Sequence, residues 1–174
     1  LYMRGCGLIL VPTTLLAMVD AAIGGKTGVD FGGYKNIVGT FYPADEIRID
    51  TDFLSTLPDA VYRAGLAEVI KHALLGDAEL YRLLREDRKG ILARDGSLLP
   101  WMVERAVAVK KGYVERDPRE QGVRAHLNLG HTFAHALETV TGYDVSHGDA
   151  VGWGIGKAMA YGERAGLTDP GYVG

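Results

Sequence analysis

The sequence has little cysteine, little net charge and no long apolar run. Cys6 is the only cysteine among 174 residues, which excludes a disulfide framework and a cysteine-rich metal site and favours a reducing compartment. The formal net charge of −3 gives no reason to expect nucleic acid or an anionic membrane as partner. No stretch reaches the roughly 18 apolar residues that a membrane-spanning helix needs. We therefore expect a cytoplasmic protein.

The N-terminal residues do not make a good targeting signal. Residues 1–22 hold an arginine, an apolar run and small residues, in the rough order of a signal peptide. Pro12 and two threonines interrupt the run, and Asp20 follows it closely. Because Leu1 is not an initiator residue, we expect the chain to be a piece of a longer protein.

Glycine is abundant: the 24 glycines make up about 14% of the chain, roughly twice the average usage. Several of them lie in "GGKTGVDFGGYKN", residues 24–36, together with Lys26, Lys35 and Asn36. Glycine lets backbone N–H groups approach an anion, so the segment resembles a phosphate-binding loop. It fits neither common glycine-rich nucleotide pattern. A glycine-rich surface hairpin with solvated lysines explains it equally well.

The pattern of apolar residues changes near Pro58. Before it, "GLILVP" and "EIRID" predict short strands, and "TDFLSTLP" predicts a helix start or a single turn. After it, apolar residues recur at helical intervals in residues 59–87, 97–117 and 151–167. The chain therefore divides into the tail of an α/β region, residues 1–57, and a mostly helical region, residues 58–174.

Two histidines lie four residues apart in "HLNLGHTFAHALE", residues 126–138, which the pattern predicts to be helical. That spacing places His131 and His135 on one helical face. Zinc proteases use the same spacing with a glutamate after the first histidine, but Thr132 stands there. A metalloprotease is therefore disfavoured.

A divalent metal site is one interpretation of the histidines. His131, His147 and Glu68 would form a set of two imidazoles and one carboxylate, which suits a cation that acts on a bound oxygen. The alternative is that they are ordinary core or surface histidines. Glu68 and His72, also four apart, form a rival pair that spacing does not exclude.

Charged residues precede the histidine segment in residues 110–128, among them Lys110, Glu120, Arg124 and Asn128. The spacing predicts that Arg124, Asn128 and His131 share a helical face. An arginine beside a metal would suit a substrate carboxylate or phosphate. A solvated helix face is the alternative.

Three blocks in order, "VPTTLLAMVDAAIGGKTGVDFGGYKNIVGTFYPADEIRIDTDFLSTLP", "GLAEVIKHALL" and "RAHLNLGHTFAHALE" with "SHGDAVGWG", resemble the 3-dehydroquinate synthase family nearly end to end. The resemblance implies a lyase of the shikimate pathway, in aromatic amino acid biosynthesis. Such an enzyme converts 3-deoxy-D-arabino-heptulosonate 7-phosphate to 3-dehydroquinate with NAD and a divalent metal, zinc or cobalt. Residues 1–57 would be the C-terminal part of the NAD-binding α/β domain. Residues 58–174 would be the helical metal- and substrate-binding domain, incomplete at its C-terminus.

Site residues follow from the same resemblance. It implies that the metal is bound by Glu68, His131 and His147. It implies that the substrate and the catalytic steps involve Lys26, Asn36, Lys71, Lys110, Arg124, Asn128 and His135. It implies that the nucleotide is faced by Thr13, Thr14, Asp20, Lys26, Lys35, Thr56 and Leu57. Arg4 would reach the phosphate site of a neighbouring subunit, which implies a homodimer.

The chain departs from the family pattern at Ala60 and Val61, where Arg-Glu is frequent, and the family's glycine-rich dinucleotide turn would lie before Leu1. In the family the departing phosphate serves as its own base, which would explain Thr132.

Two alternatives to a dehydroquinate synthase remain. One is a sister sugar-phosphate cyclase whose substrate has no carboxylate, which Arg124 disfavours. The other is a non-catalytic metal- or nucleotide-binding module, and the isolated 174 residues are expected to be inactive.

Overall fold

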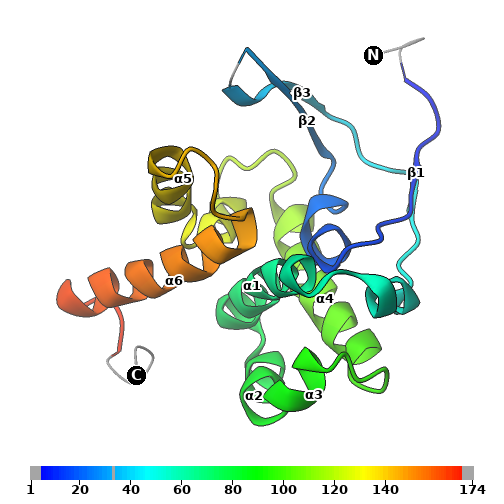
Figure 1. Ribbon diagram of the computed structural model, residues 1–174. Helices are drawn as coiled ribbons and strands as arrows, with labels where there is room; N and C mark the ends of the chain where they lie inside the picture. The colour runs from blue at the N-terminus through cyan, green and yellow to red at the C-terminus, as the bar shows by residue number, and fades with distance from the viewer. Residues whose placement is uncertain (1–4, 33, 170–174) are drawn as a thin grey trace.

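The chain forms short N-terminal strands followed by a mostly helical region, as the sequence predicts (Figure 1). The computed structural model describes residues 5–32 and 34–169. The side chains of Asp30, Tyr34, Lys35 and Asn36 lie outside this description. Within the described residues, no helix has the length and apolar character needed to cross a lipid bilayer.

Two small sheets make up the strand region. Strand β1 (Ile9–Leu10) pairs in parallel with β4 (Glu46–Ile47), in the two segments for which the sequence predicts strands. Strands β2 (Lys26–Phe31) and β3 (Tyr34–Phe41) form an antiparallel hairpin that projects from the helical body (Figure 1). Gly28 lies opposite Gly39, and a Cβ on Gly39 would lie 2.1 Å from the Thr27 carbonyl oxygen. Glycine at these positions therefore allows the two strands to approach each other closely.

Two short helical segments lie in the strand region, one between β1 and β2 and one between β4 and the first long helix. A π-helical turn, η2 (Ala17–Ala21), follows β1, and the sequence pattern did not predict it. The 3₁₀ helix η3 (Thr51–Thr56) lies where the sequence predicts a helix start or a single turn before Pro58. Asp50 caps η3 by accepting a hydrogen bond from the Asp52 backbone N–H.

The helical region begins at Asp59, where the apolar period changes. It contains α1 (Asp59–Gly76), α2 (Ala78–Glu86), α3 (Arg88–Leu92), α4 (Leu99–Arg116), η4 (Val123–Asn128), α5 (His131–Val140) and α6 (His147–Arg164). The expected helical stretch 59–87 divides at Asp77, whose carboxylate caps α2 through the Leu80 N–H and accepts two hydrogen bonds from Arg105. A cap residue inside a periodic stretch thus ends one helix and starts the next.

Residues 126–138 do not form the single helix that their pattern predicts. The 3₁₀ helix η4 ends at Asn128, and α5 begins only at His131. Gly130, between them, has φ 81°, and a Cβ there would lie 2.6 Å from the Ile155 backbone nitrogen. The prediction that Arg124, Asn128 and His131 share one helical face is therefore wrong, because a tight glycine turn against α6 separates them.

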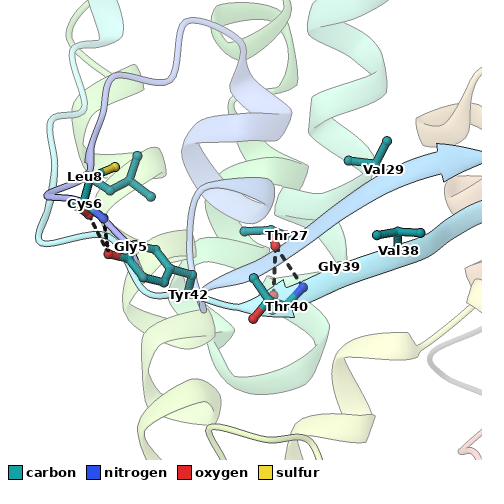
Figure 2. A pocket seen from close by; sticks show the side chains of 9 residues that line it. All are labelled: Gly5, Cys6, Leu8, Thr27, Val29, Val38, Gly39, Thr40 and Tyr42. Atoms are coloured by element: carbon teal, nitrogen blue, oxygen red, sulfur yellow. Dashed lines mark hydrogen bonds between the residues drawn. The ribbon is translucent and has the colours of Figure 1, made fainter. Parts of the chain in front are cut away.

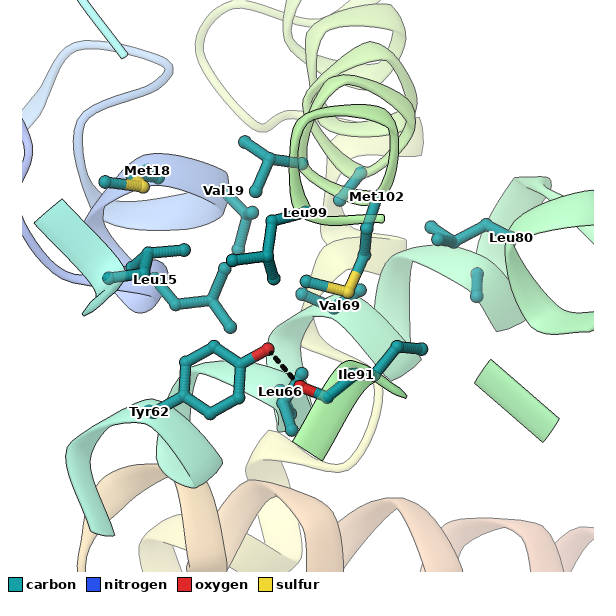
Figure 3. Close-up of a cluster of buried hydrophobic side chains, with 14 residues drawn as sticks. Leu15, Met18, Val19, Tyr62, Leu66, Val69, Leu80, Ile91, Leu99 and Met102 are labelled. Atoms are coloured by element: carbon teal, nitrogen blue, oxygen red, sulfur yellow. Dashed lines mark hydrogen bonds between the residues drawn. The ribbon is translucent and has the colours of Figure 1, made fainter. Parts of the chain in front are cut away.

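Two apolar cores hold the helices together. The larger joins η2 to α1 and α4, with Leu15, Met18, Tyr62 and Met102 fully or almost fully buried (Figure 3). The Tyr62 hydroxyl donates to the Ile91 carbonyl at 2.8 Å inside this core. The smaller core joins α1, α5 and α6 and consists of Ala67, Ala134, Ala150, Val151 and Ile155. Its small side chains bring the three helices close enough for their polar residues to meet.

Candidate metal and substrate site

Helix α1 carries an acidic side chain into the protein interior. Glu68 has no exposed surface, and its neighbours Leu66 and Val69 belong to the larger core. Its Oε2 forms an ion pair with the ammonium of Lys71, one turn later. Among the described residues, its Oε1 accepts no hydrogen bond. Such a group is costly to bury, so its free Oε1 favours a second cationic partner.

Two imidazoles face that oxygen from two other helices. His131 is the first residue of α5, and His147 is the first residue of α6, directly after the capping Ser146. Their Nε2 atoms lie 3.8 Å and 3.9 Å from Glu68 Oε1. One ligand atom from each of the three residues lies within 4.8 Å of the others. The structure therefore brings together three side chains that are far apart in the sequence.

The second nitrogen of each imidazole points away from this cluster to an acceptor. His131 Nδ1 lies 3.4 Å from the Leu129 carbonyl oxygen, and His147 Nδ1 lies 3.3 Å from Glu138 Oε1. Each acceptor favours the tautomer that has its proton on Nδ1. The lone pair of each Nε2 is then directed at Glu68, as metal ligation requires.

The chemistry of these donors fits zinc or cobalt. Burial, reinforced by the charge of Lys71, lowers the pKa of His131 to about 4, so its imidazole is neutral at pH 7. Burial and the nearby Asp20 charge raise the pKa of Glu68, and Lys71 opposes them. A cation near Oε1 would favour the ionised carboxylate. Two imidazoles and a carboxylate are ligands that zinc and cobalt accept.

The rival set predicted from spacing, Glu68 with His72, also gains a third member. Ligand atoms of Asp20, Glu68 and His72 lie within 4.8 Å of one another. Asp20 Oδ1, however, already has the Lys110 ammonium at 2.6 Å and the Lys71 ammonium at 4.0 Å. Burial alone would raise the pKa of Asp20, but Lys110 and Lys71 lower it to about 2. A metal cation there would meet two ammonium groups, so the His131–His147 set is the better candidate.

A group of basic side chains lies beside the acidic cluster. Lys110 and Arg124 are 6% and 3% exposed. Burial lowers the pKa of Lys26, and the charges of Arg124 and Lys110 lower it further. Arg124 donates to the Pro118 carbonyl at 2.7 Å and to the Gly24 carbonyl at 3.0 Å, which connects the glycine-rich segment to η4. A lysine whose pKa is lowered by two neighbouring cations favours an anionic ligand.

The acidic Glu120 contacts this basic group, although the sequence analysis gave it no role. It forms an ion pair with Lys26, and its Oε1 accepts a hydrogen bond from Asn128 Nδ2 at 2.7 Å. Its backbone has φ 56°, an uncommon conformation for a residue with a side chain. Such strain concentrates at functional sites. Its only sequence signal was its place in a charged segment.

The other predicted site residues that the structure describes differ in exposure and in the contacts they make. His135 is exposed one turn after His131, with ring centroids 5.6 Å apart. Thr14 caps the turn before η2 by accepting from the Ala17 N–H, and Thr13 beside it is exposed. Thr56 is exposed at the end of η3, whereas Leu57 packs on the larger core.

Three predicted residues lie partly or wholly outside the description. The backbones of Lys35 and Asn36 lie in β3 near the turn of the hairpin, whereas Lys26 lies at its base. Their side chains are not described. Arg4, predicted to reach a second subunit, lies outside the described residues.

Two of the cavities lined by described residues lie beside the hairpin. One, of about 320 Å³, lies between residues 5–8 and the hairpin, where Val29, Val38 and Tyr42 line it (Figure 2). None of the described residues that line it is a lysine, an arginine, a histidine or an acid. The other, of about 340 Å³, is lined by Pro12, Ala21 and Lys26 and therefore adjoins η2 and the basic group. Only the second cavity is suited to a charged ligand.

Comparison with known proteins places both parts of the chain in one family. The family described as 3-dehydroquinate synthase N-terminal matches residues 1–64, and 3-dehydroquinate synthase C-terminal matches residues 65–173. The 3-dehydroquinate synthase of Sulfolobus acidocaldarius is 47% identical over 173 residues, which cover 99% of this chain and 49% of that protein. The chloroplastic 3-dehydroquinate synthase of Arabidopsis thaliana is 43% identical over 173 residues, covering 99% and 39%. The chain thus spans about half the length, or less, of these curated relatives.

Solved structures share the fold. The 2-epi-5-epi-valiolone synthase ValA of Streptomyces hygroscopicus, with NAD⁺ and Zn²⁺ bound, has a TM-score of 0.88 at 34% identity, over 99% of this chain and 49% of its own. A 2-deoxy-scyllo-inosose synthase complexed with carbaglucose-6-phosphate, NAD⁺ and Co²⁺ has a TM-score of 0.87 at 27% identity, over 99% and 47%. Both similar proteins bind NAD⁺ and a divalent metal.

Proposed function

The chain belongs to the 3-dehydroquinate synthase family, and on that premise we propose that it carries the metal- and substrate-binding half of a 3-dehydroquinate synthase. The observation that carries the proposal is the convergence of His131 and His147 Nε2 on one buried oxygen of Glu68, beside a basic group. The proposed reaction is the NAD- and metal-dependent, phosphate-eliminating cyclisation of 3-deoxy-D-arabino-heptulosonate 7-phosphate. It belongs to a protein of the relatives' full length, and the 174 residues alone are inactive.

In this proposal, Glu68, His131 and His147 hold the divalent cation. When bound, the cation would supply Lewis acidity toward substrate hydroxyls, and NAD would supply the hydride acceptor. Burial keeps His131 neutral, because its pKa of about 4 lies well below neutral pH. Because Glu68 is fully buried, its charge interaction with a bound cation would be stronger than in water.

The basic residues bind and orient the two anionic ends of the substrate. Arg124 presents a planar guanidinium, which suits a carboxylate, while Lys26 and Lys110 supply compact charges for phosphate and hydroxyl oxygens. Placement of this kind accounts for several kcal/mol of a barrier. Glu120 holds Lys26 and Asn128 in place through its two contacts.

Asp20 holds the ammonium group of Lys110 and lies near that of Lys71. Its carboxylate accepts from the Lys110 ammonium at 2.6 Å and lies 4.0 Å from that of Lys71. Burial lowers the pKa of Lys110, and the Asp20 charge opposes that effect. The contact with Asp20 holds Lys110, on α4, against η2. In this proposal η2 faces the nucleotide and α4 faces the substrate.

An assay of phosphate release tests the proposal. A full-length protein containing this chain, supplied with NAD and Zn²⁺ or Co²⁺, should release phosphate from the seven-carbon acid phosphate, and its Glu68→Gln variant should not. Release from a sugar phosphate without a carboxylate, but not from the acid, would instead identify a sister cyclase. Absence of release from either would reject the proposal.

A further inference from the structure

We propose that Glu138 is a positioning residue: it fixes the tautomer and ring orientation of His147, so that His147 Nε2 is available to the cation. This inference rests on the proposed metal site of Glu68, His131 and His147. Neither the family resemblance nor the sequence pattern assigned Glu138 a role. The structure gives it one because of what its carboxylate contacts.

Glu138 is a buried acid on the same helix as His131. It lies two turns after His131 on α5, and only 3% of its surface is exposed. Residues seven apart lie on the same helical face, so α5 presents both side chains toward α6. A carboxylate buried at this depth requires polar partners.

Its contact with His147 has the geometry of a ligand support. Glu138 Oε1 lies 3.3 Å from His147 Nδ1, while His147 Nε2 lies 3.9 Å from Glu68 Oε1. The imidazole therefore stands between two carboxylates, one at each ring nitrogen. Because a carboxylate can only accept, the contact with Glu138 places the proton on Nδ1.

His147 needs this support more than His131 does. The His147 side chain is 36% exposed, whereas that of His131 is 15% exposed and more tightly enclosed. His131 Nδ1 faces a backbone carbonyl at 3.4 Å, and His147 Nδ1 faces the Glu138 side-chain carboxylate at 3.3 Å. Such a carboxylate restricts ring rotation and increases the basicity of the ligating nitrogen.

Glu138 is not itself a candidate ligand. Its oxygen lies on the Nδ1 side of the His147 ring, and the Glu68 oxygen lies on the Nε2 side. The described groups that could hold a metal include Glu68, His131 and His147 but not Glu138. Glu138 therefore acts through His147 rather than on the cation.

The tautomer of His147 can be measured without any metal. In the metal-free full chain, two-bond ¹H–¹⁵N correlation spectra should show the Nδ1–H form, and Glu138→Met, which has no comparable acceptor, should shift His147 to the Nε2–H form. Competition with a chelator should then show about 10- to 100-fold weaker Zn²⁺ binding in Glu138→Met. The Co²⁺ absorption spectrum should change as well. The matched control is Glu163→Gln, an exposed acid on α6, which should alter none of these readouts.

A double-mutant cycle covers the case in which Glu138→Met does not fold. Glu138→Gln should weaken Zn²⁺ binding severalfold in the wild-type background and not at all in a His147→Ala background. An Nε2–H tautomer in the wild type, or equal Zn²⁺ affinity with and without Glu138, would overturn the inference. Failure of the metal site itself is distinguishable from failure of this inference. If Glu68, His131 and His147 do not hold the metal, the wild type and the Glu68→Gln variant would bind Zn²⁺ with equal affinity.

Discussion

Gly148 of α6 packs directly against Ala64 of α1, so closely that a Cβ on Gly148 would lie 2.1 Å from the Ala64 carbonyl oxygen. This contact holds α6, and with it His147, against the helix that carries Glu68. Glycine is required there because the obstacle is backbone, which cannot move aside cheaply.

Gly148→Ala should therefore destabilise the protein, by about 1–3 kcal/mol or more, since it overpacks two helix backbones. The control is Gly156→Ala on the same helix, where an added Cβ meets nothing within 4 Å. That change should be neutral or stabilise by up to about 1 kcal/mol through helix propensity. Urea unfolding measures both free energies, and equal effects of the two variants would contradict the packing argument.

His72 should make the stability of the metal-free protein depend on pH. Burial, aided by the charge of Lys71, lowers its pKa from 6.5 to about 3. The unfolded chain therefore binds more protons than the folded chain between these values. Stability is then complete above about pH 6.5 and falls as the pH drops toward 3.

Replacement of His72 by Gln should reduce this slope by up to about 1.4 kcal/mol per pH unit, the value for one proton. Unfolding free energies at several pH values between 7 and 4, in a chelator, measure it. His131, with a pKa of about 4, should leave a residual slope of the same sign. An unchanged slope would show that His72 is not held neutral.

Arg124→Lys should cost about 1–3 kcal/mol of stability, because two partly buried hydrogen bonds from the guanidinium to backbone carbonyls would be lost. These are the carbonyls of Pro118 and Gly24. Lysine cannot reproduce the fork of arginine. Arg82→Lys, at an exposed position, should change the unfolding free energy by less than about 0.5 kcal/mol. A similarly small effect of Arg124→Lys would contradict the connecting role of Arg124.

Zinc should stabilise the chain through Glu68. A ligand at 100 times its dissociation constant adds about 2.7 kcal/mol to the unfolding free energy if it binds only the folded state. Thermal unfolding with zinc, and again after chelation, should show this gain and its reversal. Glu68→Gln should abolish it, whereas a gain that persists in this variant would place the metal elsewhere.

Sequence patterns predicted local structure better than they predicted the site. The strands at β1 and β4 and the start of α1 after Pro58 follow from short-range periodicity. The division at Gly130 does not, since a glycine within a periodic stretch is tolerated in many helices. Only the packing of α5 against α6 shows that Gly130 must adopt a positive φ.

The metal candidates show the same limit. Spacing alone did not exclude Glu68 with His72 as a rival to the set with His131 and His147, since both His72 and Glu68 lie on one face of α1. Tertiary structure separates them, because it places the lysine ammoniums around Asp20 and leaves Glu68 Oε1 to the other two imidazoles. Glu138 gave no sequence signal at all, since its partner His147 is on another helix.

Anomalous diffraction from crystals grown with zinc, recorded on both sides of the zinc absorption edge, tests the central claim most directly. The proposed site predicts one strong peak at about 2.0–2.2 Å from Glu68 and from the Nε2 atoms of His131 and His147. A peak between Asp20 and His72, or none near Glu68, would contradict it.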